Sequence, residues 1–67
     1  MPSDLDILRT AQALIRQHGD DAEIHAAMRA DELLEAGALD GNAVMMRVVR
    51  AIRELRRTQP KPGETVQ

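Results

Sequence analysis

The sequence predicts an all-α fold, with a compact three-helix domain over residues 1–57 and a disordered tail over residues 58–67. Three observations predict it. Apolar residues recur at the spacing of amphipathic helices in three stretches. Glycines and capping residues separate these stretches, and none of them alternates apolar and polar residues as a strand does. We expect helices at about residues 4–17, 21–36 and 41–57.

The first helix is predicted from a start signal, an apolar side and a stop signal. Ser3 is a favourable N-cap, and the acids that follow it in the first turn complement the helix dipole. Gly19, after His18, supplies the left-handed residue that often ends a helix. The apolar side consists of Ile7, Leu8, Ala11, Leu14 and Ile15.

The second helix begins almost directly after Gly19, so we expect a sharp corner between the first two helices. Asp20 or Asp21 is the expected N-cap, and Glu23 stands three residues after Asp20, at the capping-box position. The alanines on one side allow a neighbouring helix to approach closely. Further apolar residues widen this side, which predicts a middle helix that contacts two neighbouring helices. The apolar residues are Ala22, Ala26, Ala30 and Leu33, with Ala27, Leu34, Ile24 and Met28 beside them.

The third helix is expected to begin after Gly37. Asp40 is the expected N-cap, and Leu39 before it is expected to pack on Val44 as a hydrophobic staple. The predicted core side is Val44, Met45, Val48, Ala51, Ile52 and Leu55. The opposite side carries Arg47, Arg50, Arg53 and Arg57.

The composition predicts a domain that needs an additional source of stability. The 67 residues include no Phe, Tyr, Trp or Cys, and a core of this size rarely supplies more than about 3–5 kcal/mol. Because disulfides and thiolate metal sites are excluded, we expect self-association, as a homodimer, or binding to another protein. No stretch is long and apolar enough for a signal peptide or a membrane span, so we expect a cytoplasmic protein without membrane contact.

Charge divides the chain into an acidic and a basic part. Residues 1–40 hold nine acids and three arginines, whereas residues 41–67 hold six basic residues and two acids. On the flank of the third helix, Met and Val stand beside arginines, a combination typical of protein interfaces. The predicted partner-binding residues are Met46, Val49, Arg50 and Arg53, with an acidic helix of a second copy as a candidate partner.

The alternative function is a small nucleic-acid-binding regulator that uses the same arginines. Its recognition helix should carry base-reading residues near its start, where this chain has Gly41, Asn42 and Ala43. The acidic pI of about 5.5 also differs from the basic character expected of such a protein. We therefore prefer a non-enzymatic protein-interaction module.

Chemistry-bearing residues are few. Asp21 and His25 stand four residues apart, but with His18 they form no recognised set of metal ligands. Asp31 lies at the edge of the apolar side, either as a buried catalytic candidate or, as we prefer, as an acid that pairs with an arginine or reaches solvent. No nucleophile and base accompany it. We predict no catalytic, cofactor-binding or metal-binding residue.

One segment resembles a known family. HGDDAEIHAAMRADELLEAG, residues 18–37, followed by Leu39-Asp40-Gly41, is similar to a family of short uncharacterised helical proteins of alphaproteobacteria. The resemblance extends to Ile15, Ala43-Val44 and Arg50-Ala51, and it does not include the tail. Members of that family carry an aromatic residue near Met45, which is absent here, so an anchor of the core or of an interface is replaced. The resemblance implies no activity, because the family has no assigned function.

Overall fold

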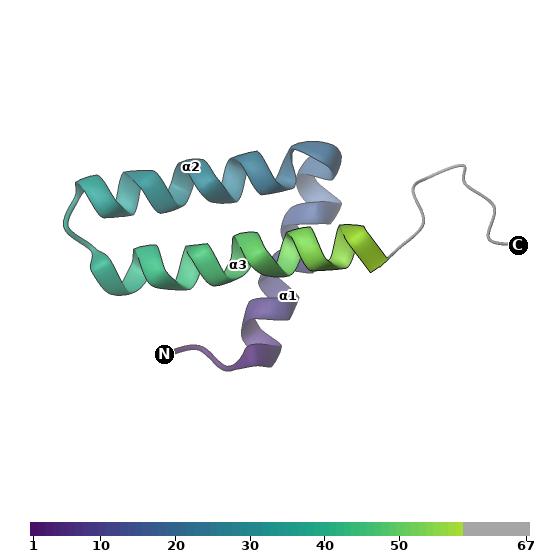
Figure 1. Cartoon of the computed structure of the whole chain (residues 1–67), viewed down its shortest axis with the longest axis horizontal. Coiled ribbons are helices and arrows are strands. Elements are labelled where there is room, and N and C mark those ends of the chain that lie inside the picture. The colour runs from purple at the N-terminus through teal and green to yellow at the C-terminus, as the bar shows by residue number, and fades with distance from the viewer. Residues whose placement is uncertain (59–67) are drawn as a thin grey trace, which may run out of the picture.

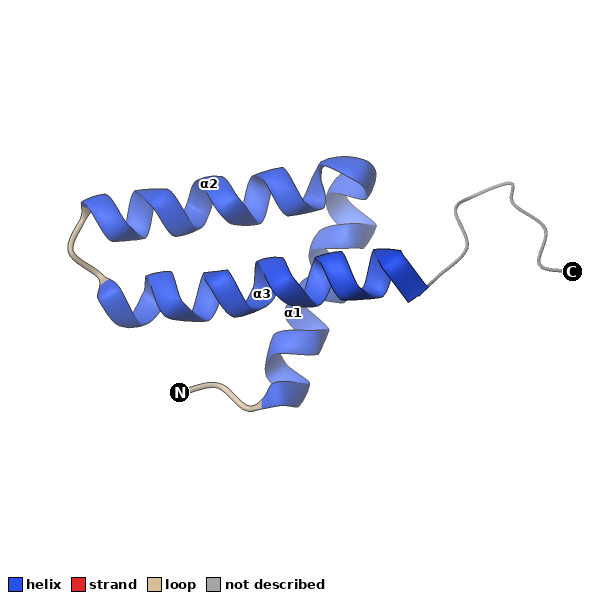
Figure 2. Ribbon diagram, viewed as in Figure 1, coloured by secondary structure: helices blue, strands red, loops and turns tan. Residues whose placement is uncertain are grey.

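A computed structural model describes residues 1–58 as three α-helices and one 3₁₀ turn, and Figure 2 shows a short loop before the last helix. This confirms the predicted all-α class. The tail predicted from residue 58 lies outside the described residues, except for Thr58, which still belongs to the last helix. None of the helices within residues 1–58 has the length and apolar character needed to cross a membrane. The elements are α1 (Asp4–His18), η1 (Gly19–Asp21), α2 (Ala22–Glu35) and α3 (Leu39–Thr58).

The helices α2 and α3 form an antiparallel hairpin, and α1 crosses it (Figure 1). In this view α1 passes behind α3, close to the start of α2 and to the second half of α3. The end of the hairpin that holds the α2–α3 connection extends beyond α1. One broad side of the hairpin therefore carries α1, and the opposite side carries no third helix from the described part of the chain.

The corner between α1 and α2 is built on Gly19, as the sequence predicts. This residue has φ 57° and ψ −125°, a conformation that residues with a Cβ rarely adopt, and its N–H donates to the carbonyl of Ile15. Of the two expected N-caps of α2, Asp21 is confirmed, so the capping box that depends on Asp20 is wrong. The N-cap is Asp21, whose side chain makes no capping hydrogen bond because its backbone (φ −90°, ψ 1°) is not extended.

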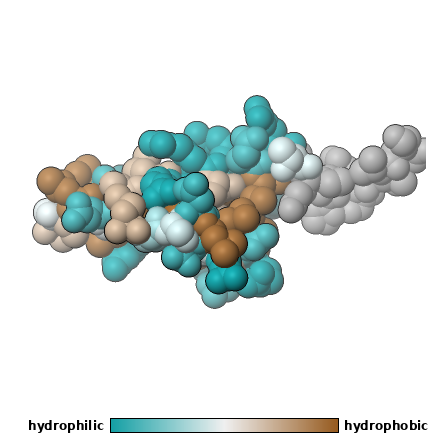
Figure 3. Space-filling view, turned by 90° about the horizontal axis from the view of Figure 1, so that it is seen from below, coloured by the Kyte–Doolittle hydropathy of each residue, from teal (hydrophilic) through white to brown (hydrophobic). Residues whose placement is uncertain are grey.

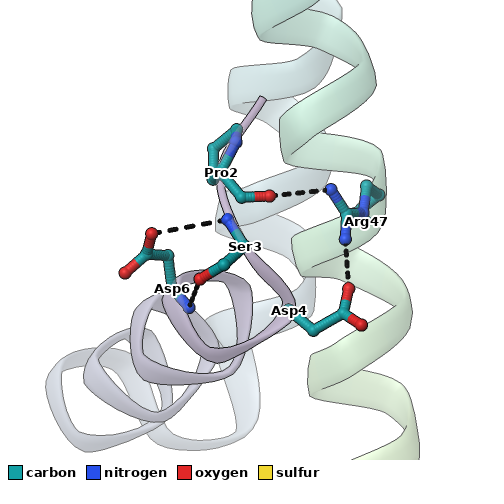
Figure 4. A network of polar contacts seen from close by, with 5 residues as sticks. All are labelled: Pro2, Ser3, Asp4, Asp6 and Arg47. Carbon is teal, nitrogen blue, oxygen red and sulfur yellow. Dashed lines mark hydrogen bonds and ion pairs between the residues drawn. The ribbon is translucent and has the colours of Figure 1, made fainter.

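The start of α1 is capped and tied to α3 (Figure 4). Ser3 Oγ accepts a hydrogen bond from the N–H of Asp6 (3.2 Å), and the Ser3 N–H donates to the Asp6 carboxylate (3.4 Å), which completes a capping box. Arg47 of α3 donates to the carbonyl of Pro2 (3.2 Å) and pairs with Asp4. These contacts hold the start of α1 against α3.

The connection between α2 and α3 is a Schellman motif. Gly37 has φ 76°, and its N–H and that of the next residue donate to the carbonyls of Leu34 and Leu33 (3.0 and 2.8 Å). The chain then enters α3 at Leu39, so the predicted N-cap at Asp40 is wrong. The predicted staple is also wrong, because Leu39 is 65% exposed.

The core lies where the three helices meet, and alanine supplies half of it. The alanines of α2 face α3, where Asn42 of α3 donates to the carbonyl of Ala30 (2.8 Å). The predicted core side of α3 is confirmed, since all its members are buried or pack against the core. The buried residues are Ile7, Ala11, Ala22, Ala26, Ala30, Val48, Val49 and Ile52.

Candidate interaction surfaces

The structure separates the four residues predicted to bind a partner. Met46 is 39% exposed, as expected, but Val49 is only 4% exposed and belongs to the core. The expectation that Val49 is accessible is therefore wrong, because the alanine side of α2 lets the two helices approach until Val49 is covered. Arg53 reaches Glu23 of α2 in an ion pair (3.0 Å). Arg50 lies elsewhere, in a groove between α1 and α3.

Two rows of residues form the side of the hairpin that faces away from α1. The ion pair between Glu23 and Arg53 locates this side on both helices. On α2, three more residues lie within about 40° of Glu23, and on α3 three more lie within a sector of about 60° that includes Arg53. We name this surface the hairpin face. Its residues are Glu23, Ala27, Ala30 and Leu34 of α2 and Asn42, Met46, Val49 and Arg53 of α3, with Ala30 and Val49 buried beneath the others.

The hairpin face is opposite the side of α3 that contacts α1. Ala51 and Leu55 line the groove between α1 and α3, and they lie about 160–200° around the helix from Arg53. Figure 1 agrees, because α1 passes behind α3 in this view. The hairpin face is thus left open within residues 1–58.

The hairpin face is charged at one end and mostly apolar over the rest, where Asn42 is the polar residue. The ion pair of Glu23 with Arg53 marks the end near the start of α2. From there to the α2–α3 connection, the outward side chains are half-buried Ala27, 39% exposed Met46 and 53% exposed Leu34. The sequence interpretation places Ala27 and Leu34 beside the core side. Their spacing of four and eleven residues from Glu23 is the signal that identifies this row.

The groove between α1 and α3 is a second apolar feature, with a volume of about 440 Å³. Its apolar lining comes from both helices, and charged residues of both signs stand around it. Figure 3 shows apolar side chains near the middle of the side seen from below and at the end that holds the α2–α3 connection. The lining residues are Ile7, Leu8, Ala51 and Leu55, with Asp4, Arg47, Arg50 and Glu54.

Ion pairs occupy most of the arginines of α3. Within residues 1–58, only Arg50 of the five makes no ion pair. Surface pairs of this kind are weak, yet they reduce the positive charge that α3 presents. The nucleic-acid interpretation stays a prediction, and this arrangement gives it no support. The pairs are Arg47–Asp4, Arg53–Glu23, Arg56–Asp20 and Arg57–Glu54.

The outer side of α2 is more exposed than the sequence predicts. Ile24 and Met28 are 59% and 56% exposed, so α2 does not use them to contact a second neighbour. The reason is the position of α1, which crosses the broad side of the hairpin and leaves the outer edge of α2 uncovered. Asp31 is also exposed, and it makes no ion pair with the described residues. The interpretation of Asp31 as an acid that reaches solvent is confirmed.

The two histidines lie together at the corner between α1 and α2. The rings of His18 and His25 stack, with centroids 3.8 Å apart and an angle of 18° between their planes. Residues 1–58 contain no group of three or more His, Cys, Asp or Glu side chains arranged to hold a metal ion. In this stacked arrangement the faces of the two rings point toward each other, and their nitrogen atoms do not.

Comparisons of the chain with models of protein families, with curated proteins and with solved structures found no match. The resemblance to the alphaproteobacterial family therefore stays a prediction.

Proposed function

We propose that this protein is a non-enzymatic interaction module that associates with further copies of itself through the hairpin face. The observation that carries the proposal is the distribution of large apolar side chains. Only four residues larger than alanine are buried, whereas eight large apolar residues of the described chain are exposed. Large exposed apolar surface on a small domain is typical of interaction sites. The exposed residues are Met1, Leu5, Leu8, Ile24, Met28, Leu34, Leu39 and Met46, and of these Leu34 and Met46 lie on the hairpin face.

Energetic considerations support a second copy as the partner. Complete burial of a Leu or Met side chain contributes about 1.5–3 kcal/mol, which is a large part of the stability that a core of this size supplies. In a symmetric dimer every such contact occurs twice. Association through the hairpin face thus adds apolar burial that α1 does not provide. The contact set that we propose therefore differs from the one expected from the sequence. It keeps Met46 and Arg53, leaves Arg50 out, and has Val49 buried beneath the face.

The test compares two leucines that are equally exposed. Leu34 lies on the hairpin face and Leu5 lies on α1, and each is 53% exposed. We expect the natural chain to exceed its monomer mass of 7.4 kDa in light scattering after gel filtration. Leu34→Glu should return it to the monomer mass, because a carboxylate would lose its hydration in the interface.

Leu5→Glu is the matched control and should leave the mass of the natural assembly unchanged. Circular dichroism of both variants checks that the helices are retained. A natural chain that stays at 7.4 kDa at all concentrations would contradict the proposal. Equal effects of the two substitutions would show that association uses a different surface.

A further inference from the structure

The hairpin face has a polar end and an apolar end, and this asymmetry restricts how two copies can stack. A two-fold axis parallel to the helices places α2 of one copy on α3 of the other. A two-fold axis that runs across the helices, in the plane of the hairpin, places α2 on α2 and α3 on α3. Both arrangements are isologous, so each uses the same face of both copies.

Charge distinguishes the two arrangements. Within its bounds α2 carries four acids and one arginine, whereas α3 carries five arginines and two acids. Stacking α2 on α3 brings opposite charges together twice. Stacking each helix on its own counterpart places two helices of net negative charge together and two helices of net positive charge together, which is unfavourable.

The positions of polar and apolar residues select the same arrangement. In the hairpin, Glu23 lies across from Arg53 and Ala30 lies across from Asn42. Ala27 therefore lies across from Met46. When the axis is parallel to the helices, each residue of one copy contacts, in the second copy, the residue that lies across the hairpin from it. The charged end of one copy therefore packs on the charged end of the other. With the other axis, the ion-paired end of one copy covers the apolar end of the next and loses its hydration.

Side-chain size fits the first arrangement as well. Met46 is long and adaptable, and in that arrangement it lies over Ala27 of the second copy, where a small side chain leaves room for it. Glu23 and Arg53 of the two copies form a ring of alternating charge at the other end.

We propose that two copies pack hairpin face to hairpin face with the two-fold axis parallel to the helices, so that α2 of each copy lies antiparallel on α3 of the other. This inference rests on the proposed self-association and specifies its geometry. Met46 of one copy contacts Ala27 of the second, and Glu23 of one copy pairs with Arg53 of the second. The two hairpins thus form two packed layers of two helices each, and α1 of each copy lies on the outer side of its layer.

Disulfide trapping tests this geometry, because the chain contains no cysteine. Ala27→Cys and Met46→Cys are prepared as separate variants, mixed and oxidised, and the disulfides are identified by mass spectrometry. We expect the mixed disulfide in excess over both self-disulfides, since only the mixed pair lies within the reach of a disulfide. Oxidation of each variant alone should give little covalent dimer.

The possible outcomes separate this inference from the proposed function. If the self-disulfide of Ala27→Cys or Met46→Cys predominates, or if an associated sample forms no disulfide, the geometry is wrong and self-association stands. If light scattering finds only monomer, both are wrong. As a second test, Glu23→Arg and Arg53→Glu should each weaken association, and mixing the two variants should restore it. Equal masses for the mixture and the separate variants would overturn the charge pairing.

Discussion

Ile52→Ala is expected to remove most of the free energy of unfolding of this domain. Ile52 is completely buried and is one of the two largest fully buried side chains. Truncation of a buried Ile to Ala lowers the free energy of unfolding by about 2–5 kcal/mol, and a core of this size supplies about 3–5 kcal/mol. Loss of this one side chain is therefore comparable to the whole free energy of unfolding of the domain. Urea unfolding followed by far-UV circular dichroism measures the effect.

The control for this substitution is Leu5→Ala, which removes a side chain that is 53% exposed. We expect its free energy of unfolding to stay within about 0.5 kcal/mol of the natural value, as is usual for surface substitutions. An Ile52→Ala variant as stable as the Leu5→Ala variant would contradict the assignment of Ile52 to the core.

Ala26→Leu is expected to have the second largest effect. Ala26 is 1% exposed on the side of α2 that faces α3. A larger side chain there must push the helices apart or force strained rotamers, which lowers the free energy of unfolding by about 1–3 kcal/mol. It also disturbs the contact of Asn42 with the carbonyl of Ala30. The midpoint of urea unfolding should fall accordingly.

Ala43→Leu makes the same change at an exposed position of α3. Ala and Leu have similar helix propensities, so this variant should unfold near the natural midpoint. If Ala26→Leu is as stable as Ala43→Leu, the close approach of α2 and α3 does not depend on the alanine row.

The periodic features of the sequence predict the fold well. The apolar side of α3 is long and regular, so its core residues can be identified without knowledge of α1 or α2. Glycine positions are equally informative, because Gly19 and Gly37 adopt positive φ values that few other residues tolerate. Local chemistry alone thus predicts where α1 and α2 end.

Features that depend on contacts between helices could not be predicted from the sequence. Glu23 stands at a capping-box spacing, but its carboxylate pairs with Arg53, which lies thirty residues away. Burial of Val49 depends on how closely α2 approaches, and exposure of Ile24 depends on where α1 crosses the hairpin. Neither the angle nor the position of that crossing follows from helical periodicity.

The sequence leads to part of the surface that we propose. Its position beside the arginines selects Met46, which also lies on the hairpin face. The sequence does not select Leu34, because a wheel of α2 alone does not indicate which apolar residues α3 covers. The antiparallel pairing of the two helices, located by Glu23 and Arg53, provides that information.

The central claim is that a small alanine-rich core is completed by a second copy, and the concentration dependence of thermal unfolding tests it most directly. Association that involves only the folded state stabilises that state by mass action. We therefore predict that the melting temperature of the natural chain rises with each tenfold increase in concentration, while that of Leu34→Glu stays constant. A melting temperature of the natural chain that does not change over the whole concentration range would contradict the account.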